Sequence, residues 1–572
     1  MKKFLKIPFR ILNSWILSVI FVVLIIIGVS FHIVVVRGYL DEVMRNQYVD
    51  LLDKELVIPS YSMPLNVYYD YQIDEWGIRS KEMFSDRNKI IDDELPEMRM
   101  YIDESYLDEL EENLPASGKV YKEATLKYGW DEFEIKMRYK GLNAYHWNGL
   151  KKSYKIKLED GGIDGRDSFK LDNIKTLPII YSYLANRVAE DFGIITSKTD
   201  FVKLYINDRY EGLYMMFDEF DEEFLEERGL PDGEIYSAKN LNEYSHPHLP
   251  VNIYESAYTW GRDYDDFLGR ENLENFLEVL QSVIEGSGSS DELYQVLDRD
   301  YFVRFAAWLV AIQSPHLDYF HNNVLYFNSE NGKMYAIPSD SAGFEALFSI
   351  NIVSNDLLLA LHKDPKFVFD KNRMVYEKYT EGEYPVAIKD MFTSYVEKIT
   401  PAVKGASHIV FGMYGLRTPI PVEEYDSRIA TTGGRINGYT AIPQHLSANT
   451  ASYKTDGSSL IVSSDNYAGI SLKGIDGCSG VYRDVDRDGV GDMSVDWNEP
   501  LYSGLLYEKK KTLYQDYNMF MPLAPLHYHY VLSGACEPSA VRVKNLITGE
   551  EFEARRVEEL REESNFTVHP WG

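Results

Sequence analysis

Cysteine and positive charge are both in short supply in this sequence. The 572 residues include two cysteines, Cys478 and Cys536, which excludes a disulfide-dense scaffold and a zinc site built from four thiolates. The two could pair in an oxidising compartment or stay free thiols, and the sequence leaves both states open. The 59 basic residues face 90 acidic ones. The resulting net charge of −31 repels nucleic acid and anionic lipid, so we expect neither as a main ligand.

Several common catalytic motifs are also absent. The chain has no G-x-x-x-x-G-K-[ST], no H-E-x-x-H and no G-x-S-x-G, which argues against a P-loop, a zincin metalloprotease and an α/β-hydrolase. What the chain does contain is 45% hydrophobic and 14% aromatic residues. This composition excludes a largely disordered protein, and the length allows two to four domains.

An apolar segment lies near the N-terminus. Residues 15–36 are apolar apart from three positions and are long enough to cross a hydrocarbon layer of about 30 Å as a helix. Four basic residues precede the segment, so the positive-inside rule places residues 1–14 in the cytoplasm. We therefore expect a single-pass protein of the cell membrane whose bulk is extracytoplasmic. The alternative is a cleaved signal peptide, but the segment is long for one and lacks a small-x-small cleavage site.

The amino-acid composition of the rest of the chain changes twice. Residues 37–95 are polar, charged and rich in Tyr, which indicates a stalk. Strand-like alternation follows, for example over 133–139, and then helical periodicity. From about residue 446, Gly, Ser, Thr and short strands predominate. This order predicts an α+β, two-lobed domain over 96–445 and a β-rich domain over 446–572.

The strongest local pattern joins two aspartates and an asparagine. Asp318 is followed five residues later by Asn323, and Asp340 comes at the end of the next predicted hairpin. Phosphoryl transfer to a hydroxyl needs one Asp to orient or deprotonate the acceptor, and an Asn and an Asp to hold metal against the phosphates. Hard oxygen ligands of this kind suit Mg²⁺ or Mn²⁺. The alternative is turn chemistry, in which the same side chains cap hairpin ends.

Phosphoryl transfer also needs a cation that is held rigidly against the nucleotide phosphates. The predicted strand over 152–158 alternates, so Lys152 shares a face with its apolar residues. A lysine on that face would point inward, as a phosphate-contacting lysine would, and Lys151 and Lys157 are substitutes. The alternative is a lysine that snorkels at the end of a strand.

Further motifs accompany these residues in a fixed order. They are Arg138-Tyr-Lys-Gly141, Lys151-Lys-Ser-Tyr-Lys-Ile-Lys-Leu158, Phe201-Val-Lys-Leu-Tyr-Ile-Asn207, Tyr210-Glu-Gly-Leu-Tyr214, Phe217-Asp-Glu219 and Gly332-Lys-Met-Tyr-Ala-Ile-Pro338. In their order and spacing, over about residues 96–400, the chain resembles the CotH kinase-like family of spore-coat proteins. The resemblance implies an atypical protein-kinase-like fold and a secreted or surface-attached enzyme that uses ATP and a divalent metal.

The resemblance also implies roles for individual residues. Lys152 would contact the phosphates, and Asp318 would be the catalytic aspartate. Asn323 and Asp340 would bind Mg²⁺ or Mn²⁺. Glu219, which matches an acidic position of the family, would orient the lysine.

The chain departs from the family pattern at two places. The family's R-G-x-S stretch is Lys140-Gly-Leu-Asn143 here, so the phosphate contacts of that loop stay open. Ser339 stands in place of the family's Trp before the metal-binding Asp, and Ala342 in place of a second Asp after it. Loss of that second carboxylate would weaken metal binding, and it keeps a pseudokinase as an alternative.

A second candidate metal site lies in the β-rich part. Asp484, Asp486, Asp488 and Asp492 occupy positions 1, 3, 5 and 9 of a loop with Gly at position 6, which matches the front of a calcium-binding loop. The Glu expected at position 12 is replaced by Val495. The loop is similar to shortened calcium loops of extracellular modules and predicts structural Ca²⁺. The alternative is an acidic surface turn.

The leading functional hypothesis is therefore a membrane-anchored extracytoplasmic kinase. It would transfer phosphate from ATP to a Ser or Thr of an envelope or surface protein, or to a glycan. One alternative is a surface binding or adhesion protein on a catalytically degenerate kinase-like scaffold. Another is a polysaccharide-processing enzyme with Asp318 and Asp340 as paired acids.

Overall fold

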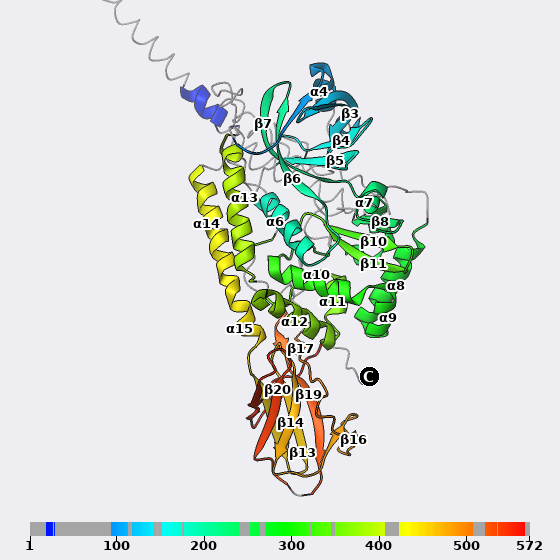
Figure 1. The fold of residues 1–572 in the computed structure, drawn as a ribbon, viewed down its shortest axis with the longest axis vertical. Helices are drawn as coiled ribbons and strands as arrows, with labels where there is room; N and C mark the ends of the chain where they lie inside the picture. Colours follow the sequence, from blue (N-terminus) through cyan, green and yellow to red (C-terminus); the bar gives the residue numbers. More distant parts are fainter. Residues whose placement is uncertain are drawn as a thin grey trace, which may run out of the picture.

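The computed structural model places three parts along the long axis of the molecule (Figure 1). A closed β-sheet lies at one end, a mainly helical part lies in the middle, and a β-sandwich lies at the other end. The structure describes residues 19–26, 28, 93–112, 117–140, 146, 151–173, 177–238, 252–262, 269–319, 322–341, 343–344, 349–381, 383–405, 422–506, 521–534 and 536–566.

Seven strands form the closed sheet. They are β1 (Glu97–Tyr101), β2 (Lys122–Tyr128), β3 (Asp131–Tyr139), β4 (Tyr154–Leu158), β5 (Ser168–Asn173), β6 (Thr199–Ile206) and β7 (Arg209–Asp218). Their order is β1-β2-β3-β4-β5-β7-β6, and the sheet closes because β1 pairs in parallel with β6. Helix α4 (Glu104–Glu111) follows β1.

Side chains alternate between the two faces of this sheet. Ile135 and Met137 of β3 and Ile156 of β4 point inward, into a core that closes the interior. Met215 of β7 points outward and joins the core of the helical part instead. The outer face of β7 is therefore packed against the helices, while other parts of the outer face are open to solvent.

The middle part combines helices with a four-stranded sheet of order β11-β10-β8-β9. Its elements are α6 (Leu177–Asp191), α7 (Glu222–Glu227), β8 (Gly233–Ala238), β9 (Trp260–Arg262), α8 (Glu271–Glu285), α9 (Ser290–Val296), α10 (Arg299–Ile312), β10 (Asn323–Asn328), β11 (Lys333–Pro338), α11 (Asp356–Leu361), α12 (Pro365–Glu381), α13 (Val386–Gly405), α14 (Val422–Gly438) and α15 (Ile442–Leu446). Helix α10 is its centre, because every residue from Tyr301 to Ile312 except Arg304 is buried. Such all-round burial is typical of a core helix.

The third part is built from short strands. They are β12 (Ala451–Asp456), β13 (Ser459–Ser464), β14 (Ile470–Asp476), β15 (Val481–Asp484), β16 (Met493–Ser494), β17 (Gly504–Leu505), β18 (Leu523–Ala524), β19 (Leu526–Leu532), β20 (Ala540–Asn545), β21 (Glu551–Glu553) and β22 (Arg555–Arg556). A six-stranded sheet of order β16-β15-β19-β13-β12-β22 and a three-stranded sheet of order β14-β20-β21 enclose one apolar core.

The fold predicted from the sequence needs correction. The coarse α+β class holds, but the predicted N-terminal transmembrane helix does not, because no helix among the described residues is long and apolar enough to cross a membrane. Of the segment 15–36, the structure describes 19–26 and 28 as helix. The single-pass membrane placement predicted from this segment is therefore wrong as well.

Other predictions for the N-terminal region fall outside the described residues. These are the cytoplasmic tail over 1–14 and the stalk over 37–95, apart from residues 93–95. A further feature was not anticipated at all. The strands of the first part form a sheet closed on itself, which depends on the pairing of β1 with β6 far along the chain.

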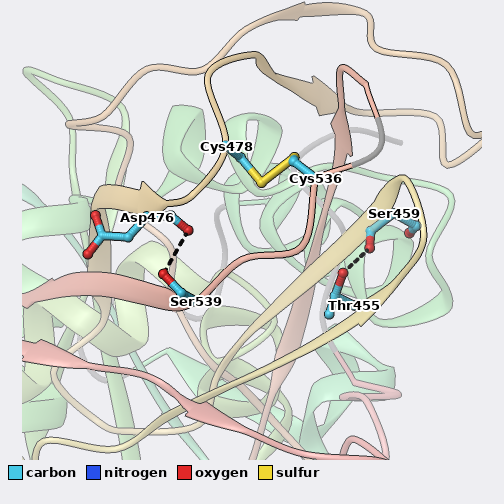
Figure 2. The surroundings of a disulfide bond; sticks show 6 residues. All are labelled: Thr455, Ser459, Asp476, Cys478, Cys536 and Ser539. Atoms are coloured by element: carbon cyan, nitrogen blue, oxygen red, sulfur yellow. Dashed lines mark hydrogen bonds between the residues drawn. A yellow bond between two sulfur atoms is a disulfide. The ribbon is translucent and has the colours of Figure 1, made fainter.

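The two cysteines form a disulfide in the β-sandwich (Figure 2). Cys478 and Cys536 are 58 residues apart, and their Cα atoms are 5.5 Å apart. Beside the bond, the Ser539 hydroxyl donates to the backbone oxygen of Asp476, at the end of β14. The bond therefore links the segment after β14 to the segment before β20, which settles the choice that the sequence left open.

Removing this disulfide is expected to destabilise the β-sandwich. Closing a loop of this length contributes about 4 kcal/mol by restricting the unfolded chain. A double Cys478→Ser, Cys536→Ser variant should therefore unfold at lower denaturant concentration than the wild type under non-reducing conditions, and dithiothreitol should shift the wild type alone. Equal stability of the two proteins without reductant would show that the bond does not constrain the fold.

Candidate functional site

Asp318, Asn323 and Asp340 lie at one end of the β10–β11 hairpin. In this hairpin Asn323 pairs with Pro338, so the loop that begins at Asp318 and the turn that carries Asp340 leave the sheet side by side. The His316 side chain joins them, because its Nδ1 lies 2.7 Å from the backbone oxygen of Asp340 and 2.9 Å from Nδ2 of Asn322. The hairpin therefore positions both aspartates from one rigid element.

Asp340 is exposed and held in an unusual backbone conformation. Its φ is 49°, and its Oδ1 accepts a hydrogen bond of 3.2 Å from the hydroxyl of Ser182 on α6. Gln313, Asn322 and Phe344 also have positive φ within this short stretch of sequence. Backbone strain of this kind persists where the surrounding structure enforces it, and it is common at functional sites. The turn thus presents the Asp340 carboxylate to solvent.

The chain packs closely beneath this turn. The amide of Phe344 donates to the carbonyl of Ile312 at the end of α10, over 2.7 Å. A side chain in place of Gly343 would meet the same carbonyl oxygen at 2.7 Å. These contacts with the end of the buried helix α10 therefore hold the backbone that follows Asp340 in place.

Asn323 is buried in a polar network. Its Oδ1 accepts hydrogen bonds from the Tyr254 hydroxyl (2.9 Å) and from Nδ2 of Asn355 (3.2 Å), while its own Nδ2 donates to the backbone oxygen of Asp318 (2.6 Å). A carbonyl oxygen has two lone pairs, so both are engaged in this arrangement. Asn323 here holds the Asp318 loop in place, and its predicted role as a metal ligand remains a prediction.

Asp318 lies at the edge of this network. The residue is only partly buried. Burial raises the pKa of Tyr254, and the negative charges of Asp356 and Asp318 add to that rise. Asp318 therefore interacts electrostatically with the phenol that orients Asn323, and the two residues belong to one polar cluster.

Lys152 lies on the inner side of the closed sheet. Its ammonium is 3.3 Å from Oε1 of Glu111 in α4 and 5.5 Å from the ring centroid of Tyr139, and its side chain is 6% exposed. The predicted strand over 152–158 begins two residues later, at Tyr154, so Lys152 precedes β4, whose Ile156 belongs to the inner core. Because the sheet is closed, the face that carries Ile156 is the enclosed interior. The predicted phosphate contact of Lys152 stays a prediction, and its observed partners are structural.

Lys151, the proposed substitute, is also buried. Its Nζ donates to the backbone oxygen of Leu213 over 2.8 Å and lies 4.8 Å from the ring centroid of Tyr214. Burial lowers the pKa of Lys151 to about 7, and the charge of Glu211 only partly opposes this shift. The Lys151 side chain therefore contacts strand β7 of the closed sheet.

A different lysine lies within electrostatic reach of Asp340. Lys140, at the end of β3, is 2.6 Å from Oδ1 of Asp172 on β5 and 4.2 Å from the ring centroid of Phe217 on β7. Burial lowers the pKa of Lys140, while Asp172 and also Asp340 oppose that shift. Since both Asp172 and Phe217 belong to the outer face of the sheet, Lys140 lies on the side that faces the helical part.

The acidic partner of Lys140 is kept ionised. Although burial acts to raise it, the pKa of Asp172 is held below its usual range by Lys140 and by His146. Nδ1 of His146 is 3.5 Å from Oδ1 of Asp172 and 3.1 Å from the hydroxyl of Ser153. The charged pair is therefore fixed from both sides.

Two further lysines lie on the same outer face. Lys155 on β4 and Lys170 on β5 are directly opposite each other, and each is 3.1 Å from a carboxylate oxygen of Glu219. Although burial acts to raise it, the pKa of Glu219 is lowered by Lys170 and Lys155. Like charges on facing strands repel, so Glu219 stabilises a cationic pair. Glu219 thus pairs with Lys155 and Lys170, and its predicted role of orienting Lys152 stays a prediction.

We call Lys140, Lys155 and Lys170 the outer-face lysines. Sequence reasoning did not select them as site residues, although a signal existed for one of them, since Lys140 occupies the Arg position of the family's R-G-x-S stretch. Lys155 and Lys170 could have been found by applying the alternation rule to the face opposite Ile156.

A group able to bind a metal ion is found in the β-sandwich. One carboxylate oxygen from each of Asp484, Asp486 and Asp492 lies within 4.8 Å of the others, whereas Asp488 is not part of this cluster. Among the described residues no comparable group of three surrounds Asp340. Mg²⁺ commonly takes one or two carboxylates together with substrate phosphates, so the chemistry at Asp340 fits such an ion.

Taken together, the structure has an α+β fold in which Lys140, on the outer face of a closed sheet, interacts electrostatically with the exposed Asp340 carboxylate. Comparison with known proteins agrees with the sequence motifs. Residues 137–349 match the family model described as CotH kinase protein. The inner spore coat protein H of Bacillus subtilis (strain 168) is 25% identical over 261 residues, which cover 43% of this chain and 68% of that protein.

The resemblance to the CotH family predicted from the motifs is therefore confirmed for the segment over residues 137–349. The matched segment contains the three outer-face lysines together with Asp318 and Asp340. The β-sandwich and its acidic loop lie outside it.

The shifted pKa of Lys151 predicts a pH dependence of stability. The unfolded chain keeps this proton up to about pH 10.5 and the folded chain only up to about pH 7, so the folded state gains stability as the pH rises between these values. Relative to a Lys151→Met variant, the wild type should gain about 1 kcal/mol per pH unit within this range. Urea unfolding of both proteins at several pH values measures the difference. A wild type that loses stability relative to the variant as the pH rises would contradict the lowered pKa of Lys151.

Proposed function

We propose that this chain transfers a phosphoryl group from ATP to a hydroxyl group, with the help of a divalent metal at Asp340. The observation that supports this function most directly is the arrangement of Lys140, which pairs with Asp172 while remaining within electrostatic reach of Asp340. Phosphoryl transfer needs both a fixed cation and a metal-binding carboxylate on the phosphates. The CotH family assignment agrees with a kinase-like function.

Each residue has a chemical role in this proposal. The outer-face lysines receive the phosphates, and their existing carboxylate partners keep them charged and oriented before the nucleotide arrives. Asp318 accepts the proton of the acceptor hydroxyl while the hydroxyl oxygen bonds to the γ-phosphorus. The bond between the γ-phosphorus and the bridging oxygen breaks, and ADP leaves. Mg²⁺ or Mn²⁺ on the phosphates, bound through Asp340, would neutralise their charge.

The acceptor is proposed by analogy with the relative. Inner spore coat protein H is named as a component of a spore coat. We therefore propose a Ser or Thr of a coat or surface protein, or a hydroxyl of a surface glycan, as the acceptor. The net charge of −31 favours an acceptor other than nucleic acid.

A second candidate function is a binding protein on a degenerate kinase-like scaffold. Two observations favour it, namely that Ala342 replaces the family's second Asp and that both lone pairs of Asn323 Oδ1 are already engaged. In this case the outer-face lysines would hold the fold together through Asp172 and Glu219 and would contact no nucleotide.

Neutralising either aspartate is expected to remove activity and leave the fold intact. Asp318→Asn lacks the proton acceptor and Asp340→Asn lacks the metal-binding charge, so each should lower transfer from γ-labelled ATP, with Mn²⁺ or Mg²⁺, by at least about 10²-fold. Because Asp340 is exposed and Asp318 only partly buried, both variants should melt near the wild type. Asp390→Asn, an exposed carboxylate on α13, is the matched control. Undiminished transfer in both variants would refute the assignment.

Substituting lysines on the two faces of the sheet distinguishes the lysines that bind phosphate from those that only support the fold. Lys140→Met should weaken ATP binding at least about tenfold, whereas Lys140→Arg, which restores the family residue, should retain it. Lys152→Met should leave ATP affinity unchanged and alter stability alone, because its partner is Glu111. Titration with a fluorescent ATP analogue and thermal melting of each variant provide the measurements. Loss of affinity in Lys152→Met with normal affinity in Lys140→Met would restore the original prediction for Lys152.

A further inference from the structure

The acidic loop of the β-sandwich closes the hairpin between β15 and β16. It begins at Asp484, which pairs with His529 of β19, and it ends just before Met493. The loop is thus anchored at both ends in the six-stranded sheet, and it lies outside the segment that matches the CotH family. One carboxylate oxygen from each of Asp484, Asp486 and Asp492 converges within 4.8 Å.

Asp484 is buried, and within the described part of the chain only one of its two carboxylate oxygens accepts a hydrogen bond. The residue is 6% exposed, and its Oδ1 is buried without a hydrogen-bond partner among the described residues. Its other oxygen, Oδ2, accepts one bond of 3.2 Å from the amide of Gly489. A buried carboxylate oxygen that finds no donor is costly. A bound cation is the partner that this oxygen lacks, and Asp486 and Asp492 are already next to it.

The remaining loop residues hold the carboxylates in place. The amide of Val485 donates to Asp492 Oδ2 over 2.6 Å, and the amide of Asp488 donates to Asp486 Oδ1 over 3.2 Å. Asp488 uses its own Oδ1 to accept from the amide of Val490. The backbone next to Asp484 is therefore hydrogen-bonded to Asp492, the last acidic residue of the loop. Asp488 shapes the turn and lies outside the cluster of three.

Arg487 connects the loop to the segment around residue 563. Both terminal nitrogens of Arg487 bond Glu563, over 3.0 and 2.8 Å, which is the two-point geometry of a strong ion pair. Oε1 of Glu563 also accepts from the amide of His527 on β19, over 2.9 Å. The loop, strand β19 and the segment around residue 563 thus form one unit.

We infer that Asp484, Asp486 and Asp492 bind a calcium ion that locks this unit. Calcium accepts several carboxylate oxygens in flexible geometry, whereas Mg²⁺ demands a near-ideal octahedron and keeps its waters. By binding all three carboxylates, the ion fixes the β15–β16 hairpin, and through Arg487 and Glu563 it fixes the segment over 561–566 as well. The ion is structural and takes no part in phosphoryl transfer.

Calcium titration of the full chain tests the site. The titration is done on Asp340→Asn, so that an ion at the proposed kinase site does not contribute heat. We expect one calcium ion with a dissociation constant on the order of 10⁻⁴ M, as in extracellular modules. Asp486→Asn and Asp484→Asn should each weaken calcium binding at least tenfold. Because Asp486 is exposed, the Asp486→Asn variant should fold normally. Asp456→Asn, an exposed carboxylate at the turn between β12 and β13, should bind as tightly as its parent.

Hydrogen exchange tests the lock. Calcium should slow amide exchange in residues 485–494 and in 561–566, and Arg487→Gln should remove the protection of 561–566 while keeping that of the loop. Absence of calcium binding, or equal binding by Asp486→Asn, would overturn the site. Protection confined to the loop in the wild-type chain would overturn the connection to the C-terminal segment.

Discussion

The ion pair between Lys140 and Asp172 is the interaction on which the candidate site depends. Its 2.6 Å contact lies on the outer face of the closed sheet, where both side chains are largely buried. A buried ammonium is stable only with a partner, and Asp172 is kept ionised by Lys140 and His146. The same ammonium is also within reach of the Asp340 charge. A fixed cation that interacts electrostatically with an exposed carboxylate suits a nucleotide with its metal.

Closure of the sheet separates two kinds of lysine. The Lys152 side chain lies on the inner side of the sheet and pairs with Glu111. Lys155, three residues later, lies on the outer face and pairs with Glu219. Because side chains alternate, a difference of one position decides whether a lysine supports the core or faces the helical part. The outer face also carries Met215, which anchors the sheet on the helical core. The outer face of the sheet therefore carries both the contacts with the helical part and the outer-face lysines.

Local patterns in the sequence carried much of this account. Alternation placed Ile135 and Ile156 inside, and the spacing of Asp318, Asn323 and Asp340 around a hairpin agrees with the register that pairs Asn323 with Pro338. Long-range pairing could not be predicted in the same way. The contact of β1 with β6 closes the sheet and turns the apolar face of Lys152 into an enclosed interior. The predicted membrane helix was wrong, because no helix among the described residues is long and apolar enough to cross a membrane.

The most direct test of the central claim is a crystal structure with Mn²⁺ and a non-hydrolysable ATP analogue. The account predicts anomalous density for manganese at the Asp340 carboxylate and phosphate oxygens in contact with the ammonium of Lys140. Phosphates bound beside Lys152, or a nucleotide absent from the surface between the closed sheet and the β10–β11 hairpin, would contradict it.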